Sequence, residues 1–274
     1  KHENPFLILK KVQDKIGINN LYIEKGDVNI RVQNGLSVAL TNCYAGIDVN
    51  KLLESDNTVR LIDAIDTFSF NKGSLKNPSI QLSLSKVWYS HMLNSLYFGQ
   101  ITENKTDKSS VTKINDARIY GINIQSFNDI ELSGLSWREA ELFLNLPKKS
   151  EATETGKKAN NALNFTLKKL NGGSTVIRLQ GKAMEATTNV KQISTDEIII
   201  KPDQKLVINN LNIEGNSISL IEDRIDGSIT LFNIRHQKES SIENVRINLP
   251  VNGEKLSLFV PRLIFSSDIN QSVA

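Results

Sequence analysis

The sequence contains one cysteine, three histidines and no long apolar run. Cys43 has no second cysteine with which to form an intramolecular disulfide, so disulfide scaffolds are excluded. The histidines, at positions 2, 91 and 236, lie too far apart in the sequence for a zinc ribbon. No stretch approaches the roughly 18 apolar residues of a membrane helix, and no signal-peptide core is present. We therefore predict no membrane span within the 274 residues.

Charge of neither sign is in clear excess. The 33 Lys and Arg residues nearly balance 30 Asp and Glu residues, which gives a formal net charge of +3. A nucleic-acid-binding domain normally carries a clear basic excess on one face, and the aromatic residues, only 6% of the chain, do not alternate with basic ones. We predict no nucleic-acid partner. Hydrophobic residues make up 39%, which is enough to bury a core and excludes a wholly disordered chain.

Catalytic motifs are also missing. Neither His91 nor His236 lies in a recognisable nucleophile–base motif, and there is no glycine-rich phosphate loop. We expect no catalytic residue, no cofactor and no metal, and hence a protein that is not an enzyme. The other candidates are interpreted as structural: Cys43 as a core residue, and the carboxylate pairs Asp63/Asp66 and Asp223/Asp226 as turn residues.

The sequence does contain many short segments in which apolar and polar residues alternate. A period of two predicts strands with one apolar and one polar face, and Gly- and Asn-containing turns separate the segments at short intervals. We predict an all-β, elongated, mostly antiparallel sheet built from repeated β units, either a groove or a sandwich. In the C-terminal half the apolar face is predicted to include Leu211, Ile213, Ile218, Leu220, Ile229, Leu231, Val245 and Ile247.

One or two short helices are expected beside the strands. Apolar spacing over residues 6–16 indicates an amphipathic helix, residues 48–53 a single turn, and the Ser136-x-x-Glu139 capping box a brief helix. Two polar segments, residues 102–113 and 148–161, are predicted as loops because they lack apolar side chains. The second is predicted to link an N-terminal β module, residues 1–150, to a C-terminal β module, residues 162–274.

A short motif recurs along the chain. The segment INNLYIE at residues 18–24 returns as INNLNIE at residues 208–214, and looser copies occur at residues 114–119 and 242–247. The first three copies are spaced by about 95 residues, which is compatible with stacked β units that each need a neighbour to cover their apolar face. Chance similarity between strands built from few residue types is the other explanation.

The residues that carry the repeat resemble a known family. Residues 18–30, a short strand, a Gly-containing turn and a second strand, look like the recurring hairpin of AsmA-like proteins; residues 130–137, followed by a strand that ends at Pro147, are also similar to that family. The resemblance implies a non-enzymatic, periplasmic or cell-envelope protein of Gram-negative bacteria that takes part in phospholipid transport or outer-membrane assembly. The family's membrane helix has no counterpart here. The resemblance therefore implies either a fragment whose anchor lies upstream of Lys1 or a soluble relative.

Two hypotheses about the apolar strand faces remain open. The faces either stay open and bind phospholipid or another envelope lipid, or they pack on each other in a β-sandwich or β-solenoid binding module that recognises polysaccharide or protein through its loops. The second hypothesis requires a closed core and exposed aromatics near loops that contain Trp88 or Trp137. A carbohydrate-active enzyme on a β scaffold is a third interpretation, and it would need two carboxylates about 5–10 Å apart in a cleft.

Overall fold

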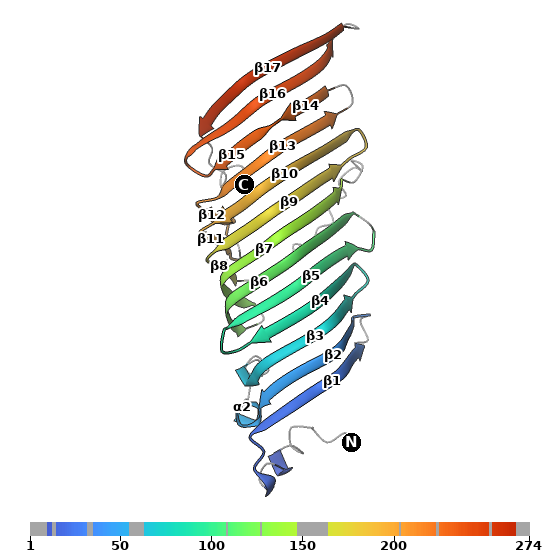
Figure 1. Ribbon diagram of the computed structural model, residues 1–274, viewed down its shortest axis with the longest axis vertical. Helices are drawn as coiled ribbons and strands as arrows, with labels where there is room; N and C mark the ends of the chain where they lie inside the picture. Colours follow the sequence, from blue (N-terminus) through green and yellow to red (C-terminus); the bar gives the residue numbers. More distant parts are fainter. Residues whose placement is uncertain are drawn as a thin grey trace.

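The computed structural model describes residues 10–12, 15–31, 35–54, 63–107, 109–126, 128–146, 164–202, 204–222, 225–251 and 254–266. Within them the chain forms one 17-stranded sheet, which confirms the prediction of an all-β, mostly antiparallel protein. Figure 1 shows the strands stacked like the rungs of a ladder along the long axis of the molecule, from β1 at one end to β17 at the other.

Most strands have 11 to 17 residues, and the exceptions, β8, β11, β12, β14 and β15, have three to five. Their bounds are β1 (Asn20–Arg31), β2 (Ser37–Asp48), β3 (Ile65–Lys76), β4 (Ile80–Ser90), β5 (Ser95–Lys105), β6 (Ser110–Ser126), β7 (Asp129–Asn145), β8 (Asn164–Leu167), β9 (Leu170–Gln180), β10 (Met184–Thr195), β11 (Glu197–Ile200), β12 (Val207–Asn209), β13 (Asn212–Glu222), β14 (Ile225–Ile229), β15 (Leu231–Arg235), β16 (Glu239–Val251) and β17 (Glu254–Ser266).

Chain neighbours are also sheet neighbours through most of the fold. Each strand from β1 to β6 pairs antiparallel with the next. Strand β7 then pairs parallel with β8 and β9, after which antiparallel pairing continues through β10, β13, β15 and β16 to β17. A parallel pair needs a long crossover connection, and here the chain between β7 and β8 supplies it. The strands on both sides of this connection therefore belong to one sheet.

The sheet is a single layer. The substantial contacts among the described elements are between sheet neighbours, apart from a short helix, α2 (Val49–Glu54), that packs on the ends of β1 and β2. The accessible surface is 18805 Å², whereas a compact protein of this mass exposes about 12,000 Å². No second sheet covers the first within the described residues, so the apolar faces do not close on each other as in a sandwich.

Of the two short helices predicted after residue 40, both of which fall within the described residues, the structure contains one and lacks the other. The predicted turn at residues 48–53 is confirmed as α2, and Asp48 caps it: its Oδ1 accepts hydrogen bonds from the backbone N–H groups of Asn50 and Lys51. The capping-box prediction is wrong, because Ser136 and Glu139 lie inside β7, where pairing on both sides overrides the local signal.

Three predicted segments fall partly or wholly outside the described residues. Residues 10–12 and 15–16 of the predicted N-terminal helix are helical, and the rest of it is not described. The predicted linker at residues 148–161 lies outside the described residues. The loop predicted at residues 102–113 is wrong for most of its length, because β5 continues to Lys105 and β6 begins at Ser110. Polar residues are suitable there because one face of a single-layer sheet is in water.

Candidate functional site: the apolar face of the sheet

One face of the sheet is mostly apolar from β1 to β17, with Glu103 and Thr112 among its polar positions, and we call it the apolar face. Residues directly opposite each other on paired strands share a face. The register therefore traces continuous cross-strand rows, such as Leu84, Ile101, Ile114 and Ala140 in the N-terminal half. A second row runs through the C-terminal half: Leu144, Leu179, Ala186, Leu220, Gly227, Ile247 and Leu258. We call the opposite face the outer face.

A crease runs across the sheet, where eleven strands (β2–β7, β9, β10, β13, β16 and β17) insert an extra residue between consecutive side chains of the apolar face. In β4 the step goes from Leu84 to Val87 rather than to residue 86, and Lys86 has a positive φ of 52°. Such a bulge bends the strand and increases its twist. Equivalent three-residue steps are Leu40/Cys43, Phe70/Gly73, Phe98/Ile101, Ile114/Ala117, Trp137/Ala140, Gly172/Thr175, Val190/Ile193, Gly215/Ile218, Ile242/Val245 and Val260/Leu263.

The recurring motif of the sequence marks these bulges. Asp116, Asn210 and Asn244 are the third residues of three of its copies, and their φ angles are 53°, 53° and 52°. Asn and Asp tolerate the left-handed region better than other non-glycine residues. The pattern of an apolar residue, two polar residues and another apolar residue is therefore the sequence signature of a bend in the strand. In β6 and β16 that bend lies on the crease.

Burial shows that the sheet bends toward the apolar face. The buried hydrophobic residues in strands all lie on this face, eight of them at the crease and Leu167 on β8: Cys43, Phe70, Val87, Ala117, Ala140, Leu167, Val190, Phe232 and Val245. Leu40 and Leu84, which are partly buried on the same face across the crease, pack against Cys43, Phe70 and Val87. A flat single layer would leave both faces exposed, so this burial requires a concave apolar face with the crease as its floor.

Large aromatic rings lie over glycines on this floor. The Trp137 ring covers Gly172 on the neighbouring strand, and its indole N–H donates a hydrogen bond of 3.1 Å to Thr175 Oγ1 across the crease. Phe232 covers Gly215 in the same way. A side chain at either glycine would occupy the space of the ring. These contacts fix the aromatic side chains on the floor and exclude Trp137 as an exposed platform near a loop.

Six of the eight predicted lining residues lie on the apolar face. Ile213, Ile218, Leu220, Ile229, Val245 and Ile247 each pair with other residues of the face. Leu211 precedes β13, and its carbonyl accepts a hydrogen bond from the His236 N–H. The placement of Leu231 differs from the prediction: it pairs with Glu243 on the outer face and is 44% exposed, whereas Phe232 is on the floor. The bulge at the β14–β15 break reverses the alternation on which the prediction depended.

The outer face carries polar and charged residues along the crease. Tyr97 donates a 2.6 Å hydrogen bond to Asp116 Oδ1, and Arg138 Nε lies 2.6 Å from Asp116 Oδ2. These two hydrogen bonds, first from Tyr97 and then from Arg138, lower the pKa of the Asp116 carboxyl. The same contact with Asp116 and partial burial raise the pKa of the Tyr97 hydroxyl. The network joins β5, β6 and β7 on the side that faces away from the apolar floor.

The titratable residues interpreted above as structural do not gather into a site. Within the described ranges, no group of three or more His, Cys, Asp and Glu residues could hold a metal ion. Cys43 is buried on the floor, and this burial, with a smaller contribution from Asp27, raises the pKa of its thiol. The pKa of the Tyr89 hydroxyl is raised mainly by burial, and the nearby carboxylates of Asp63 and Asp66 raise it further. Asp223 lies outside the described residues.

These features define a class of structure: a single-layer, creased antiparallel sheet with one continuous concave apolar face. No model of a protein family, no curated protein and no solved structure matches the chain. None of the helical segments in the part of the chain that the structure describes has the length and apolar character needed to cross a bilayer.

Proposed function

We propose that this protein is an AsmA-like, non-enzymatic component of the bacterial cell envelope that binds phospholipid acyl chains along the apolar face. The observation that supports this proposal is a continuous apolar surface that no other part of the described chain covers. Large exposed apolar patches on a monomer mark a binding surface for an apolar partner. The lipid-handling or outer-membrane-assembly role, and a periplasmic or envelope location, follow from the family resemblance.

The energetics favour such a ligand. Each CH₂ group transferred from water to an apolar surface contributes about 0.8 kcal/mol, so a 16-carbon chain would cost roughly 12 kcal/mol to carry uncovered through water. A concave face covers an acyl chain from the floor and from both walls, which removes more of this cost than a flat sheet. The polar outer face keeps the loaded protein compatible with water.

The dimensions also fit several acyl chains. The shortest path of pairings from β1 to β17 passes through β2 to β7, β9, β10, β13, β15 and β16. With neighbouring strands about 4.8 Å apart, these twelve steps give a face about 58 Å long. One leaflet of a bilayer has a hydrocarbon thickness of about 15 Å. The face is therefore long enough for acyl chains in succession.

The binding-module hypothesis required a closed apolar core between two layers. The described residues form one sheet, and Trp137 is on its concave floor with its indole N–H bonded to Thr175. The third interpretation, a carbohydrate-active enzyme, required paired carboxylates in a cleft. The lining of the 370 Å³ hollow on β2–β5 contains no carboxylate, and neither does that of the 270 Å³ hollow beside Arg235 and His236.

Native mass spectrometry of the purified protein, followed by solvent extraction and lipid analysis, tests the proposal. We expect co-purified phospholipid, and we expect Leu220→Asp to reduce its amount because Leu220 lies on the apolar face in β13. Ser219→Asp is the matched control, since it adds the same charge one residue away on the outer face. Circular dichroism shows whether both variants keep the strand content of the parent.

Two outcomes would contradict lipid binding. One is a parent protein that remains free of lipid after incubation with phosphatidylethanolamine and phosphatidylglycerol vesicles. The other is an equal loss of lipid in folded Leu220→Asp and folded Ser219→Asp. That result would show that lipid binding does not depend on the apolar face.

A further inference from the structure

We infer that the outer face of β2–β5 binds an acidic oligosaccharide. The site combines a polar hollow with a neighbouring row of exposed aromatic side chains, and it lies on the side of the sheet opposite the apolar face. It is therefore independent of the proposed lipid binding, and either proposal can fail without the other.

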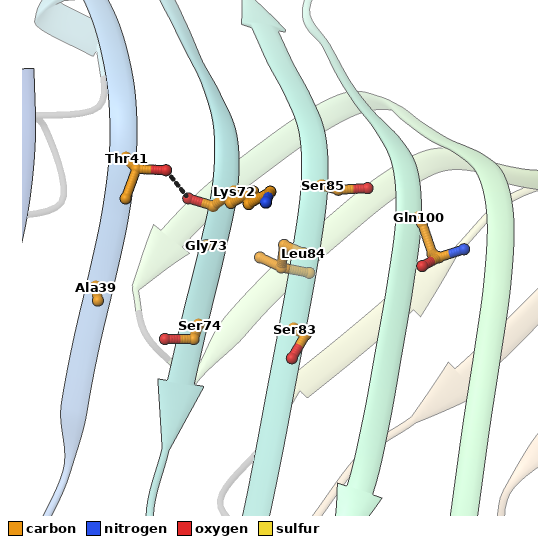
Figure 2. Close-up of a pocket in the computed structure, with 9 residues that line it drawn as sticks. All are labelled: Ala39, Thr41, Lys72, Gly73, Ser74, Ser83, Leu84, Ser85 and Gln100. Atoms are coloured by element: carbon orange, nitrogen blue, oxygen red, sulfur yellow. Dashed lines mark hydrogen bonds between the residues drawn. The ribbon is translucent and has the colours of Figure 1, made fainter. Parts of the chain in front are cut away.

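The hollow has a volume of about 370 Å³ and lies beside the crease. Figure 2 shows the side chains that line it, which come from four successive strands. Two cross-strand rows of the outer face supply seven of them: Ala39, Ser74 and Ser83 in one, and Thr41, Lys72, Ser85 and Gln100 in the other. Gly73 and Leu84, which lie between these rows along β3 and β4, complete the lining. The hollow exists because small side chains occupy positions that are flanked by longer ones.

The lining is rich in hydrogen-bonding groups that the protein leaves unused. Among the described residues, the hydroxyls of Ser74, Ser83 and Ser85 have no hydrogen-bond partner within the protein. Gln100 donates from Nε2 to Asn115 Oδ1 at 3.0 Å, which fixes its amide and leaves Oε1 as an acceptor. A ligand with several hydroxyl groups matches this mixture of donors and acceptors, and the C–H groups of a sugar ring match the apolar atoms that lie between them.

Charge in the hollow favours an acidic sugar. Lys72 is the one charged residue of the lining, and its side chain extends from β3 toward Ser85 on β4 (Figure 2). Lys86 lies next to Ser85 on the crease, and no carboxylate lines the hollow. The nearby Asp27 already accepts a hydrogen bond from the Asn42 N–H at 3.0 Å. A carboxylate on the ligand would therefore meet ammonium groups rather than acids.

The aromatic row lies on the same face of the same strands. Tyr44 and Trp88 are 41% and 39% exposed, and the register places both opposite Ser69, one on each side. They are therefore two strand spacings apart, about 10 Å, with only a serine between them. Each is three residues from the hollow along its strand, since Tyr44 follows Thr41 and Trp88 follows Ser85. Sugar C–H groups pack against the electron-rich faces of such rings.

A second hollow lies beside β13 and β15. It has a volume of about 270 Å³ and is lined by Arg235, His236 and Lys238 together with Asn210, Leu211 and Asn212. It is basic, but Arg235 Nε already bonds Asn233 Oδ1 and Asn210 Nδ2 already bonds Asp196 Oδ2. No exposed aromatic ring is part of its lining, so it carries no proposal.

Isothermal titration calorimetry of the full chain with three probes tests the site: tetragalacturonic acid, the neutral chitotetraose and inorganic phosphate. We expect tetragalacturonic acid to bind, and we expect the dissociation constant to rise about tenfold or more in Ser83→Leu, which fills the hollow. Trp88→Ala and Lys72→Gln should each weaken binding severalfold. Phe259→Ala is the control, because Phe259 is a 52% exposed aromatic residue on β17, far from the site.

Each other outcome overturns the inference. Equal binding of chitotetraose refutes the acidic class, and binding of phosphate as tightly as the oligosaccharide reduces the site to a simple anion contact. Absence of tetragalacturonic acid binding at millimolar concentration refutes the site altogether. Unchanged affinity in folded Ser83→Leu and folded Lys72→Gln refutes the location. Lipid loading, measured by mass spectrometry on the same variants, is expected to stay as in the parent.

Discussion

Gly172→Ala tests whether aromatic rings on the crease floor hold the sheet in its bent form. A Cβ at this position would lie 2.5 Å from Trp137 Cε2 and closer still to Cζ2. Because the ring is the obstacle, either Trp137 must turn away or the two strands must separate. If Trp137 turns, its 3.1 Å hydrogen bond to Thr175 Oγ1 is lost as well.

The expected loss of stability combines three terms. Overpacking costs about 1–3 kcal/mol, and loss of the indole hydrogen bond costs about 1 kcal/mol. Alanine in place of glycine within a strand recovers about 0.5–1 kcal/mol of backbone entropy. We therefore expect Gly172→Ala to lower the free energy of unfolding by about 1–3.5 kcal/mol.

Urea unfolding followed by circular dichroism measures this change, and a double-mutant cycle assigns it. In a Trp137→Leu background the obstacle is smaller, so the Gly172→Ala step should become neutral or slightly stabilising. Gly227→Ala is the matched control, because the nearest atom to its Cβ would be 3.8 Å away, and it should raise stability by about 0.5 kcal/mol. An equal cost of Gly172→Ala with and without Trp137 would refute the proposed role of the ring.

Three further predictions concern the crease. Hydrogen bonds from Tyr97 and Arg138 lower the pKa of Asp116, so their stabilisation is present above the unfolded-state pKa of about 3.9. This stabilisation is lost as the pH falls through the folded-state pKa. When the pH is lowered below about 4, the urea concentration at the unfolding midpoint should therefore decrease in the parent, and it should decrease less in Asp116→Asn. Identical pH profiles of the two proteins would contradict this prediction. Lys86 has a φ of 52°, so Lys86→Gly should stabilise the protein by up to about 1 kcal/mol and Lys86→Val should destabilise it. Thermal unfolding of both variants and the parent measures this difference. Burial raises the pKa of Cys43, so Ellman's reagent at pH 8 should label it only after unfolding, and rapid labelling of the native protein would contradict its place on the floor.

The two edge strands of the sheet carry features that disfavour pairing with another chain. Unpaired strand edges promote association between chains. Strand β17 carries Pro261, which removes a backbone donor, and β1 carries a bulge at Lys25 with a φ of 55°. Both are devices that discourage edge-to-edge pairing. They explain how a 17-stranded open sheet can keep apolar residues such as Leu256 and Leu258 more than half exposed on β17.

Alternation in the sequence was sufficient to predict strands, their antiparallel order and much of one apolar face. The reason is local: a period of two follows from backbone geometry alone, so residues such as Ile218 and Leu220 must share a side of β13. Local geometry also predicted α2, where Asp48 satisfies backbone donors within three residues of itself.

Pairing between strands that are distant in the sequence decided the features that the sequence predicted wrongly or left open. Ser136 and Glu139 form a helix-capping motif in the sequence, yet hydrogen bonds to β6 and β9 on both sides hold them in a strand. Leu231 was assigned to the wrong face because a bulge reverses the alternation, and the bulge is visible only once the strands are paired. The repeated motif was detected in the sequence, but its meaning as a bend required the φ angles of Asp116 and Asn244. The sequence by itself determined which side of most strands is apolar; only the tertiary structure decided that these sides remain open and concave, because that depends on how the strands join into one sheet.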